Sequence, residues 1–168
     1  MRLLFVDDDP DNVRGLARVL RDAFGPTSEI IEATTVEDAV AALHRPDANG
    51  RIGFDIVVTD IFIPLGEQVR GVLGPRARRI ANDRSHRLPS DQAPGGTGDL
   101  EHLGGLVLLD EIDRLSPAPV VLAHTACTDP ILTQLLGERV HARVRKPAPF
   151  EVLLNAILEV VREKEAER

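Results

Sequence analysis

Short apolar segments rich in β-branched residues alternate with segments of helical periodicity, and this alternation restricts the fold more than any other feature. Five such segments are predicted strands, at residues 3–6, 29–32, 54–59, 119–124 and 140–145. After each strand, apolar residues recur every three or four positions, which indicates a helix. Repeated strand–helix units are typical of a parallel sheet with helices on both faces. We therefore predict a doubly wound α/β fold, with residues 1–168 as a single domain.

The predicted helices begin and end at residues with known positional preferences. Pro10 suits the first turn of a helix, and Gly25 followed by Pro26 ends it. Thr34 and Thr35 precede acidic residues by three positions, the pattern of a capping box, and predict the start of a second helix. Further helices are expected at residues 105–115 and 129–136, and from residue 149 onward.

The composition excludes several classes of protein. No run of apolar residues reaches the length of a transmembrane helix, and acidic residues from Asp7 onward come too early for a signal peptide. Cys127 is the only cysteine, so no internal disulfide can form, and we expect a cytoplasmic location. The net charge of −7 makes nucleic acid an unlikely partner. No membrane partner is expected.

Polar residues follow the predicted strands at their carboxyl ends, where open α/β sheets bind ligands. Asp7 and Asp8 follow the first strand, Asp60 the third, Thr125 the fourth and Lys146 the fifth. Three carboxylates at one edge repel one another unless a cation is present, and Mg²⁺ fits a site of few carboxylates. The hydroxyl and the ammonium complete a site for a transferring phosphoryl group. Asp60 is the predicted nucleophile, which would form an aspartyl phosphate.

Each of these residues also has a structural explanation when it is taken alone. An aspartate or a threonine after a strand often caps the next helix, and a lysine before a proline usually lies on the surface. All five residues are predicted to lie at one edge of the sheet, and this coincidence favours a functional site over five separate structural roles. The choice of lysine adds to this, because 18 of the 20 basic residues are Arg and only Lys146 and Lys164 are Lys. A compact ammonium fits a crowded phosphoryl group better than a planar guanidinium.

The sequence resembles the receiver domains of two-component response regulators over residues 1–64 and 104–163. The matching segments are LLFVDDDP, VVTDIFIP, GGLVLLDEI, VVLAHTA and RKP. The resemblance implies a flavodoxin-like, five-stranded parallel sheet of order 2-1-3-4-5 with five helices. It also implies that a histidine kinase or a histidine phosphotransfer protein phosphorylates Asp60. Self-phosphorylation and autodephosphorylation would be the only reactions, so we do not expect an enzyme with another substrate.

The resemblance also implies roles for single residues. The magnesium ligands would be Asp7, Asp8, Asp60 and the backbone carbonyl of Phe62. The groups that hold phosphoryl oxygens would be Thr125, the amide of Ala126, and Lys146. A downstream protein would bind the face made by residues 129–136, residues 140–145 and the terminal helix, which is also a candidate homodimer interface. We expect a stand-alone domain without an output domain.

Two sets of residues depart from that family near the site. Arg143 stands three residues before the lysine, at the switch position where the family commonly has Tyr or Phe. It is either part of an altered switch, a partner for an acid on another protein, or a solvated charge. Phe62 and Cys127 are apolar at positions that influence the access of water to the phosphoryl group in the family. We therefore predict slow loss of phosphate.

A long insertion, at about residues 66–103, lies between Pro64 and Gly105. The first half is basic, and the second half, LPSDQAPGGTGD, is rich in Pro and Gly. The arginines of the basic half are Arg70, Arg76, Arg78, Arg79, Arg84 and Arg87. Residues 75–81 are predicted to form a short helix. Partner docking, a lid over the site and a passive insertion all remain open, and Val72 with Leu73 would favour docking as an apolar anchor.

Two other functions compete with the phosphoacceptor. The first is a pseudo-receiver, which is folded as a receiver and used only as an interaction module. The second is a phosphatase similar to the haloacid dehalogenases, with Asp7 as the nucleophile and Asp60 idle. That family needs a further acidic pair after the lysine, and the residues beyond Lys146 have none at a strand end.

Overall fold

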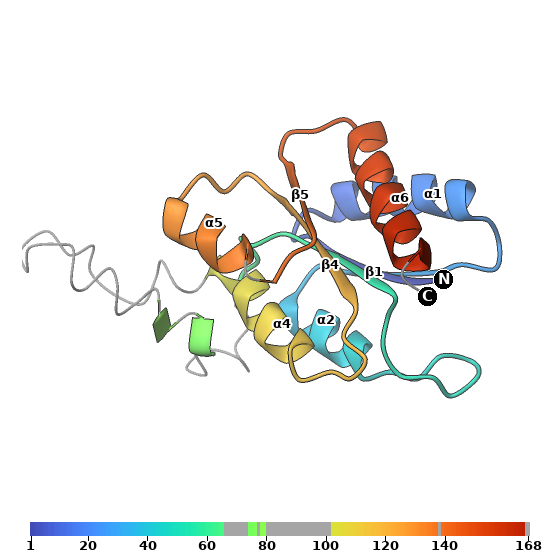
Figure 1. Cartoon of the computed structure of the whole chain (residues 1–168), viewed down its shortest axis with the longest axis horizontal. Coiled ribbons are helices and arrows are strands. Elements are labelled where there is room, and N and C mark those ends of the chain that lie inside the picture. Colours follow the sequence, from blue (N-terminus) through green and yellow to red (C-terminus); the bar gives the residue numbers. More distant parts are fainter. Residues whose placement is uncertain (66–73, 77, 80–101, 138, 167–168) are drawn as a thin grey trace, which may run out of the picture.

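Five parallel strands form one sheet in the computed structural model, which describes residues 1–65, 74–76, 78–79, 102–137 and 139–166 (Figure 1). The strands are β1 (Arg2–Val6), β2 (Glu29–Ala33), β3 (Ile56–Thr59), β4 (Val120–Thr125) and β5 (Ala142–Arg145). Their order is β2-β1-β3-β4-β5, and all neighbouring pairs are parallel. The predicted fold and strand order are confirmed.

Helices cover both faces of the sheet, with α1 and α6 on one side and α2, α4 and α5 on the other (Figure 1). Their bounds are α1 (Pro10–Phe24), α2 (Val36–Leu43), α4 (Gly104–Ile112), α5 (Pro130–Gly137) and α6 (Phe150–Ala166). Asp9 caps α1 by accepting a hydrogen bond from the amide of Asp11 at 2.9 Å. Thr35 caps α2 in the same way, with the amide of Asp38 as donor at 3.1 Å, as its position in the sequence predicted.

Two hydrophobic cores lie on either side of the sheet, because successive strand residues point to opposite faces. In β4, Val121 and Ala123 belong to the core beneath α2, α4 and α5. Val120 and Leu122 belong to the core beneath α1 and α6. Burial on both faces explains why the strands read as continuous apolar runs rather than as an alternating pattern. In the part of the chain that the structure describes, no helix is long and apolar enough to cross a membrane.

Most of the insertion, at residues 66–73, 77 and 80–101, lies outside the described residues. Its three alternative roles therefore stay predictions. Residues 75–76 and 78–79 are helical, and the amide of Arg78 donates to the carbonyl of Gly74 at 3.0 Å. The predicted short helix at residues 75–81 agrees with the structure where its residues are described.

Arg76 attaches this part of the insertion to α4. Its Nη1 lies 2.6 Å from Asp110 Oδ1, and its Nη2 lies 2.7 Å from Asp113 Oδ2. The Asp110 side chain is only 7% exposed, so its charge depends on the arginine for compensation. Gly74 makes the close approach possible, because a Cβ atom at this position would lie 2.0 Å from Asp110 Oδ2. The described residues of the insertion are therefore part of the packing around α4.

Replacing Arg76 with Ala is expected to lower the free energy of unfolding by about 3 kcal/mol, because Asp110 would become a buried carboxylate without a partner. Urea unfolding followed by circular dichroism measures the loss. The control is Arg14→Ala, which removes an exposed ion pair with Asp11 and is expected to cost less than about 1 kcal/mol. Equal losses in the two variants would contradict the structural role of Arg76.

Candidate functional site

An acidic cluster lies at the carboxyl edge of the sheet, where β1 and β3 end side by side. Val6 pairs with Thr59 in the strand register, so Asp7 and Asp60 leave the sheet next to each other. Each of Asp7, Asp8 and Asp60 offers a carboxylate oxygen, and these three oxygens lie within 4.8 Å of one another. Asp7 and Asp60 are buried, whereas Asp8 is exposed. The structure thus brings together the three predicted carboxylates.

The backbone after β3 holds the Asp60 carboxylate in place. Asp60 Oδ1 accepts hydrogen bonds from the amides of Ile61 at 2.6 Å and Phe62 at 3.2 Å. The start of α4 lies directly against this loop, and the amide of Gly105 donates to the carbonyl of Ile61 at 3.1 Å. A Cβ atom on Gly105 would lie 2.1 Å from the carbonyl oxygen of Asp60. Glycine is required there because any side chain would displace the loop.

Lys146 extends from the end of β5 into the acidic cluster. Its Nζ lies 2.6 Å from Asp7 Oδ2 and 2.6 Å from Asp60 Oδ2. Burial disfavours the ammonium, but the hydrogen bonds with Asp60 and Asp7 outweigh burial and raise the pKa of Lys146. This lysine therefore stays charged and balances two buried carboxylates.

Asp60 is held in its ionised form. Burial favours the protonated acid, yet hydrogen bonds from Lys146 and from the Thr125 hydroxyl, together with the lysine charge, lower the pKa of Asp60. An ionised carboxylate is the form that attacks phosphorus. Thr125 is buried at the end of β4, and Ala126 follows it with an exposed surface. The five predicted polar residues therefore meet at one edge.

Arg143 is exposed, but it makes specific contacts. Its Nη2 donates to the carbonyl of Cys127 at 2.9 Å, and its Nη1 donates to Thr133 Oγ1 at 3.0 Å. The amide of Cys127 in turn donates to Thr125 Oγ1 at 3.3 Å. The arginine thus connects β5 to α5 and to the loop that follows Thr125. Both acceptors are neutral and the side chain is exposed, so all three alternatives for Arg143 stay predictions.

The residues at this edge suit a hard divalent cation. Asp7 Oδ2 is buried, and Lys146 Nζ at 2.6 Å is its partner in the described part of the chain, so a lone pair of this oxygen remains for a metal ion. Burial and the charges of Asp7 and Asp60 raise the pKa of Asp8, and a divalent cation would relieve this repulsion. Carboxylate oxygens are the ligands that Mg²⁺ prefers. The role of the Phe62 carbonyl as a ligand stays a prediction.

His124 is a residue beside the site that sequence reasoning missed. Its side chain is buried, and within the described residues neither ring nitrogen has a hydrogen-bond partner. Burial and the charge of Lys146 lower the pKa of His124. The ring lines a cavity of about 340 Å³, together with Lys146, Asn12 and Phe150. A histidine inside the apolar run PVVLAH was the available signal, because a polar residue in a strand buried on both faces needs a reason.

Comparison with known proteins finds similarity at the level of structure. No family model and no curated protein matches the sequence. A CheY-like response regulator receiver domain from Methanospirillum hungatei is 19% identical, with a TM-score of 0.64 over 99% of this chain and 98% of that one. The receiver domain of an HD-domain protein from Pseudomonas fluorescens is 15% identical, with a TM-score of 0.62 over 98% of this chain and 97% of that one.

A third solved structure is a receiver domain of a two-component histidine kinase from Clostridium thermocellum. It is 17% identical, with a TM-score of 0.59 over 95% of each chain. Identities this low support a conclusion about fold only. The chain has the fold of the response regulator receivers over nearly its whole length.

The Asp8→Asn variant is expected to be more stable than the wild type at pH 7 without Mg²⁺. The raised pKa of Asp8 means that ionising this acid is harder in the folded protein than in the unfolded chain. It therefore lowers the free energy of unfolding only at pH values above 3.8, where the unfolded chain is ionised. We expect a gain of about 0.5 kcal/mol, because water screens an exposed carboxylate. The gain should disappear as the pH falls below 3.8.

Urea unfolding at neutral and acidic pH measures this difference. Asp11→Asn is a control of opposite sign, since Asp11 is paired with Arg14 in the first turn of α1. A destabilised Asp8→Asn variant at pH 7 would show that repulsion does not govern the cluster.

Proposed function

We propose that this chain, which has the receiver fold, is a phosphoacceptor domain of a two-component phosphorelay and is phosphorylated on Asp60. The observation that carries the proposal is the Lys146 ammonium, which lies 2.6 Å from a carboxylate oxygen of both Asp7 and Asp60. A purely structural acid would not need a second acid and a lysine beside it, because burying three charges is costly. Phosphoryl transfer needs these groups, since charge spreads over the phosphoryl oxygens during the reaction.

The reaction is a displacement at phosphorus. A carboxylate oxygen of Asp60 forms a bond to phosphorus as the bond between phosphorus and the donor's histidine nitrogen breaks, and the imidazole leaves with the electron pair of that bond. Lys146 and Thr125 stabilise the negative charge on the phosphoryl oxygens, together with the amide of Ala126. Mg²⁺, held by Asp7, Asp8, Asp60 and the Phe62 carbonyl, would supply further charge neutralisation.

Arg143 offers a path from the site to the surface. When the Thr125 hydroxyl turns from Asp60 to a phosphoryl oxygen, the hydrogen bond between Thr125 and the amide of Cys127 moves with it. The carbonyl of Cys127 is bonded to Arg143, so the displacement reaches β5 and α5. An altered switch built on an arginine replaces the aromatic residue of the family in this proposal. Downstream contacts, or a homodimer, would form on the face of α5, β5 and α6.

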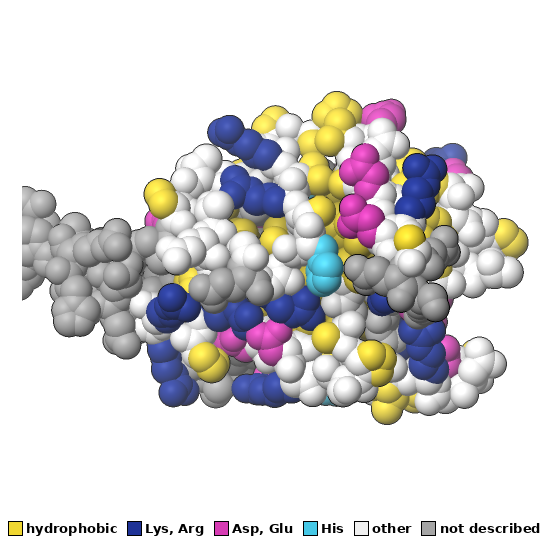
Figure 2. All heavy atoms as spheres, in the orientation of Figure 1, with side chains coloured by type: hydrophobic (Ala, Val, Ile, Leu, Met, Phe, Trp, Pro, Cys, Tyr) yellow, Lys and Arg dark blue, Asp and Glu magenta, His cyan; other side chains and the backbone are white. Residues whose placement is uncertain are grey.

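The phosphodonor in this proposal is a histidine kinase or a histidine phosphotransfer protein. One of the similar solved structures is named as a receiver domain of a two-component histidine kinase. A single cysteine, buried as Cys127, suits a reducing cytoplasm. On the face shown in Figure 2, Lys and Arg side chains are interspersed with acidic and hydrophobic ones, which suits a protein partner better than nucleic acid.

Incubation with acetyl phosphate and Mg²⁺ is expected to raise the intact mass of the protein by one phosphoryl group. The Asp60→Asn variant should stay unmodified because it lacks the nucleophile. Asp22→Asn removes an exposed acid on α1 and should be labelled like the wild type. A chelator should abolish labelling.

Other outcomes of this experiment favour the competing functions. A wild-type protein that neither gains mass nor binds Mg²⁺ would be a pseudo-receiver. Steady hydrolysis of the phosphodonor that survives in Asp60→Asn but is lost in Asp7→Asn would indicate the phosphatase.

Slow autodephosphorylation is expected for the phosphorylated protein, because Phe62 presents an apolar side chain beside Asp60 and Cys127 is buried. Phe62→Asn should shorten the half-life of the phosphoryl group by roughly tenfold, since an amide would orient an attacking water. Decay of the intact mass after removal of the donor measures this rate. Ile52→Asn, a similar change at the far end of the sheet, should leave the rate unchanged. A wild type that decays as fast as Phe62→Asn would refute the role of Phe62.

A further inference from the structure

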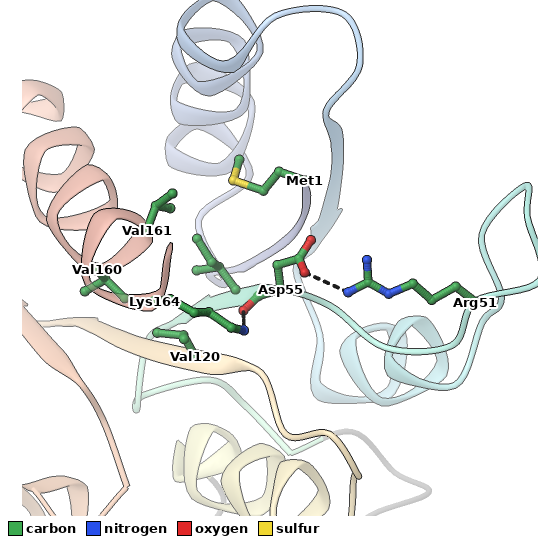
Figure 3. A pocket seen from close by; sticks show the side chains of 8 residues that line it. Met1, Arg51, Asp55, Val120, Val160, Val161 and Lys164 are labelled. Atoms are coloured by element: carbon green, nitrogen blue, oxygen red, sulfur yellow. Dashed lines mark hydrogen bonds and ion pairs between the residues drawn. The ribbon is translucent and has the colours of Figure 1, made fainter. Parts of the chain in front are cut away.

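A cavity of about 360 Å³ lies at the amino-terminal ends of the strands (Figure 3). Asp60 follows the last residue of β3 and so lies at the opposite end of the sheet. Its walls come from the start of β1, the loop before β3, the start of β4 and the last turns of α6. The apolar part of the lining is Met1, Ile56, Val120, Val160 and Val161, and the polar part is Arg51, Asp55 and Lys164. A volume of this size is at the lower end of the range for small-molecule sites.

The charge of the acid in this cavity is already compensated. Asp55 Oδ1 lies 2.7 Å from Arg51 Nη2, and Asp55 Oδ2 accepts a hydrogen bond from the amide of Arg2 at 2.7 Å. Burial opposes its ionisation, but the hydrogen bonds from Arg51 and Arg2 prevail and lower the pKa of Asp55. Arg51 and Asp55 therefore balance each other's charge, and each oxygen of Asp55 already has a partner.

Lys164 supplies a positive charge that has no ion-pair partner among the described side chains. Its Nζ makes one long hydrogen bond, of 3.3 Å, to the backbone carbonyl of Asp55 (Figure 3). Among the residues that the structure describes, no carboxylate lies within ion-pair distance of this ammonium. An ammonium has three donors, so two remain for a ligand. Because the charges of Arg51 and Asp55 cancel, the ammonium of Lys164 leaves the cavity with a net positive charge beside its apolar wall.

A second cavity, of about 280 Å³, shares Val120, Val160 and Lys164 with the first. Its lining includes Glu163, whose charge would repel an anion, and Arg139, whose charge is already paired with Asp113. An anionic group is therefore favoured on the side of Lys164 that faces Arg51. Lysine suits this contact better than arginine would, because its compact charge turns toward a single acceptor on a flexible stem.

We propose that the first cavity binds a small amphipathic carboxylate. Its hydrocarbon part contacts Val120, Val160 and Val161, and its carboxylate accepts charge-assisted hydrogen bonds from Lys164 Nζ. The cavity has room for a chain of about six to eight carbon atoms, since an engineered cavity of about 150 Å³ already binds benzene. The inference goes beyond the proposed phosphorylation and does not use Asp60.

Titration of the ¹⁵N-labelled protein with hexanoate, followed by NMR, tests the proposal. Saturable shifts are expected for amides of the cavity lining. Acetate lacks the apolar part and hexanol lacks the charge, so each should bind at least about tenfold more weakly. Shifts scattered over the surface, or equal binding of hexanol and hexanoate, would overturn the proposal, and so would the absence of saturation.

Substitutions separate the cavity from general charge effects. Lys164→Gln should weaken hexanoate binding by about tenfold through loss of the charged donor. The matched control is Arg162→Gln, which removes a positive charge from an exposed position on the same helix and should bind as the wild type does. Equal weakening in both variants would refute a specific role for Lys164. The Asp60→Asn variant should bind hexanoate normally, whatever the outcome of the phosphorylation experiment.

Discussion

The ammonium of Lys146 lies between two buried carboxylates, and the strand order of the sheet brings these three groups together. Asp7 and Asp60 follow β1 and β3, which are central neighbours, so both acids emerge at one point of the carboxyl edge. Two carboxylates this close would raise each other's pKa without a cation. Lysine, at the end of β5, extends across the end of β4 to reach them. The order β1-β3-β4-β5 thus brings these residues, far apart in the sequence, to one point where their charges compensate one another.

Helix α4 connects this site to the described part of the insertion. Its first residues include Gly105, which lies against the backbone of Asp60, and near its other end Asp110 forms an ion pair with Arg76. The helix is only nine residues long, and nearly all of it is buried. A short helix held at both ends transmits displacement better than a solvated one, because close-packed interiors yield little. The described residues around Arg76 and the loop that holds Asp60 thus pack against the same short helix.

The fold and the candidate site could be predicted because both depend on local patterns. The apolar runs predicted the positions of the strands. Once the sheet was taken as parallel, the polar residue after each strand, such as Asp60 or Lys146, predicted the position of the site. The pairing of Arg76 with Asp110 could not be predicted, since 34 positions separate the two residues. The sequence of the basic half also does not indicate which of its arginines contacts the helix. The contacts of Arg143 were missed for a similar reason. Its position was known to be unusual, but its acceptor on Cys127 is a backbone carbonyl, which leaves no trace in a sequence.

The two lysines of the chain show how surroundings assign different chemistry to one residue type. Lys146 lies against two carboxylates of the protein, which compensate its charge. The acids beside it would need only a further cation to compensate their remaining negative charge. Lys164 lies beside a carboxylate whose oxygens are taken by Arg51 and Arg2, and it is left with a backbone carbonyl. A carbonyl dipole compensates an ammonium only in part, because it carries no net charge. In the proposals made above, the amino-terminal end of the sheet therefore binds an anion from outside the chain, whereas the carboxyl end binds a metal ion and a phosphoryl group together.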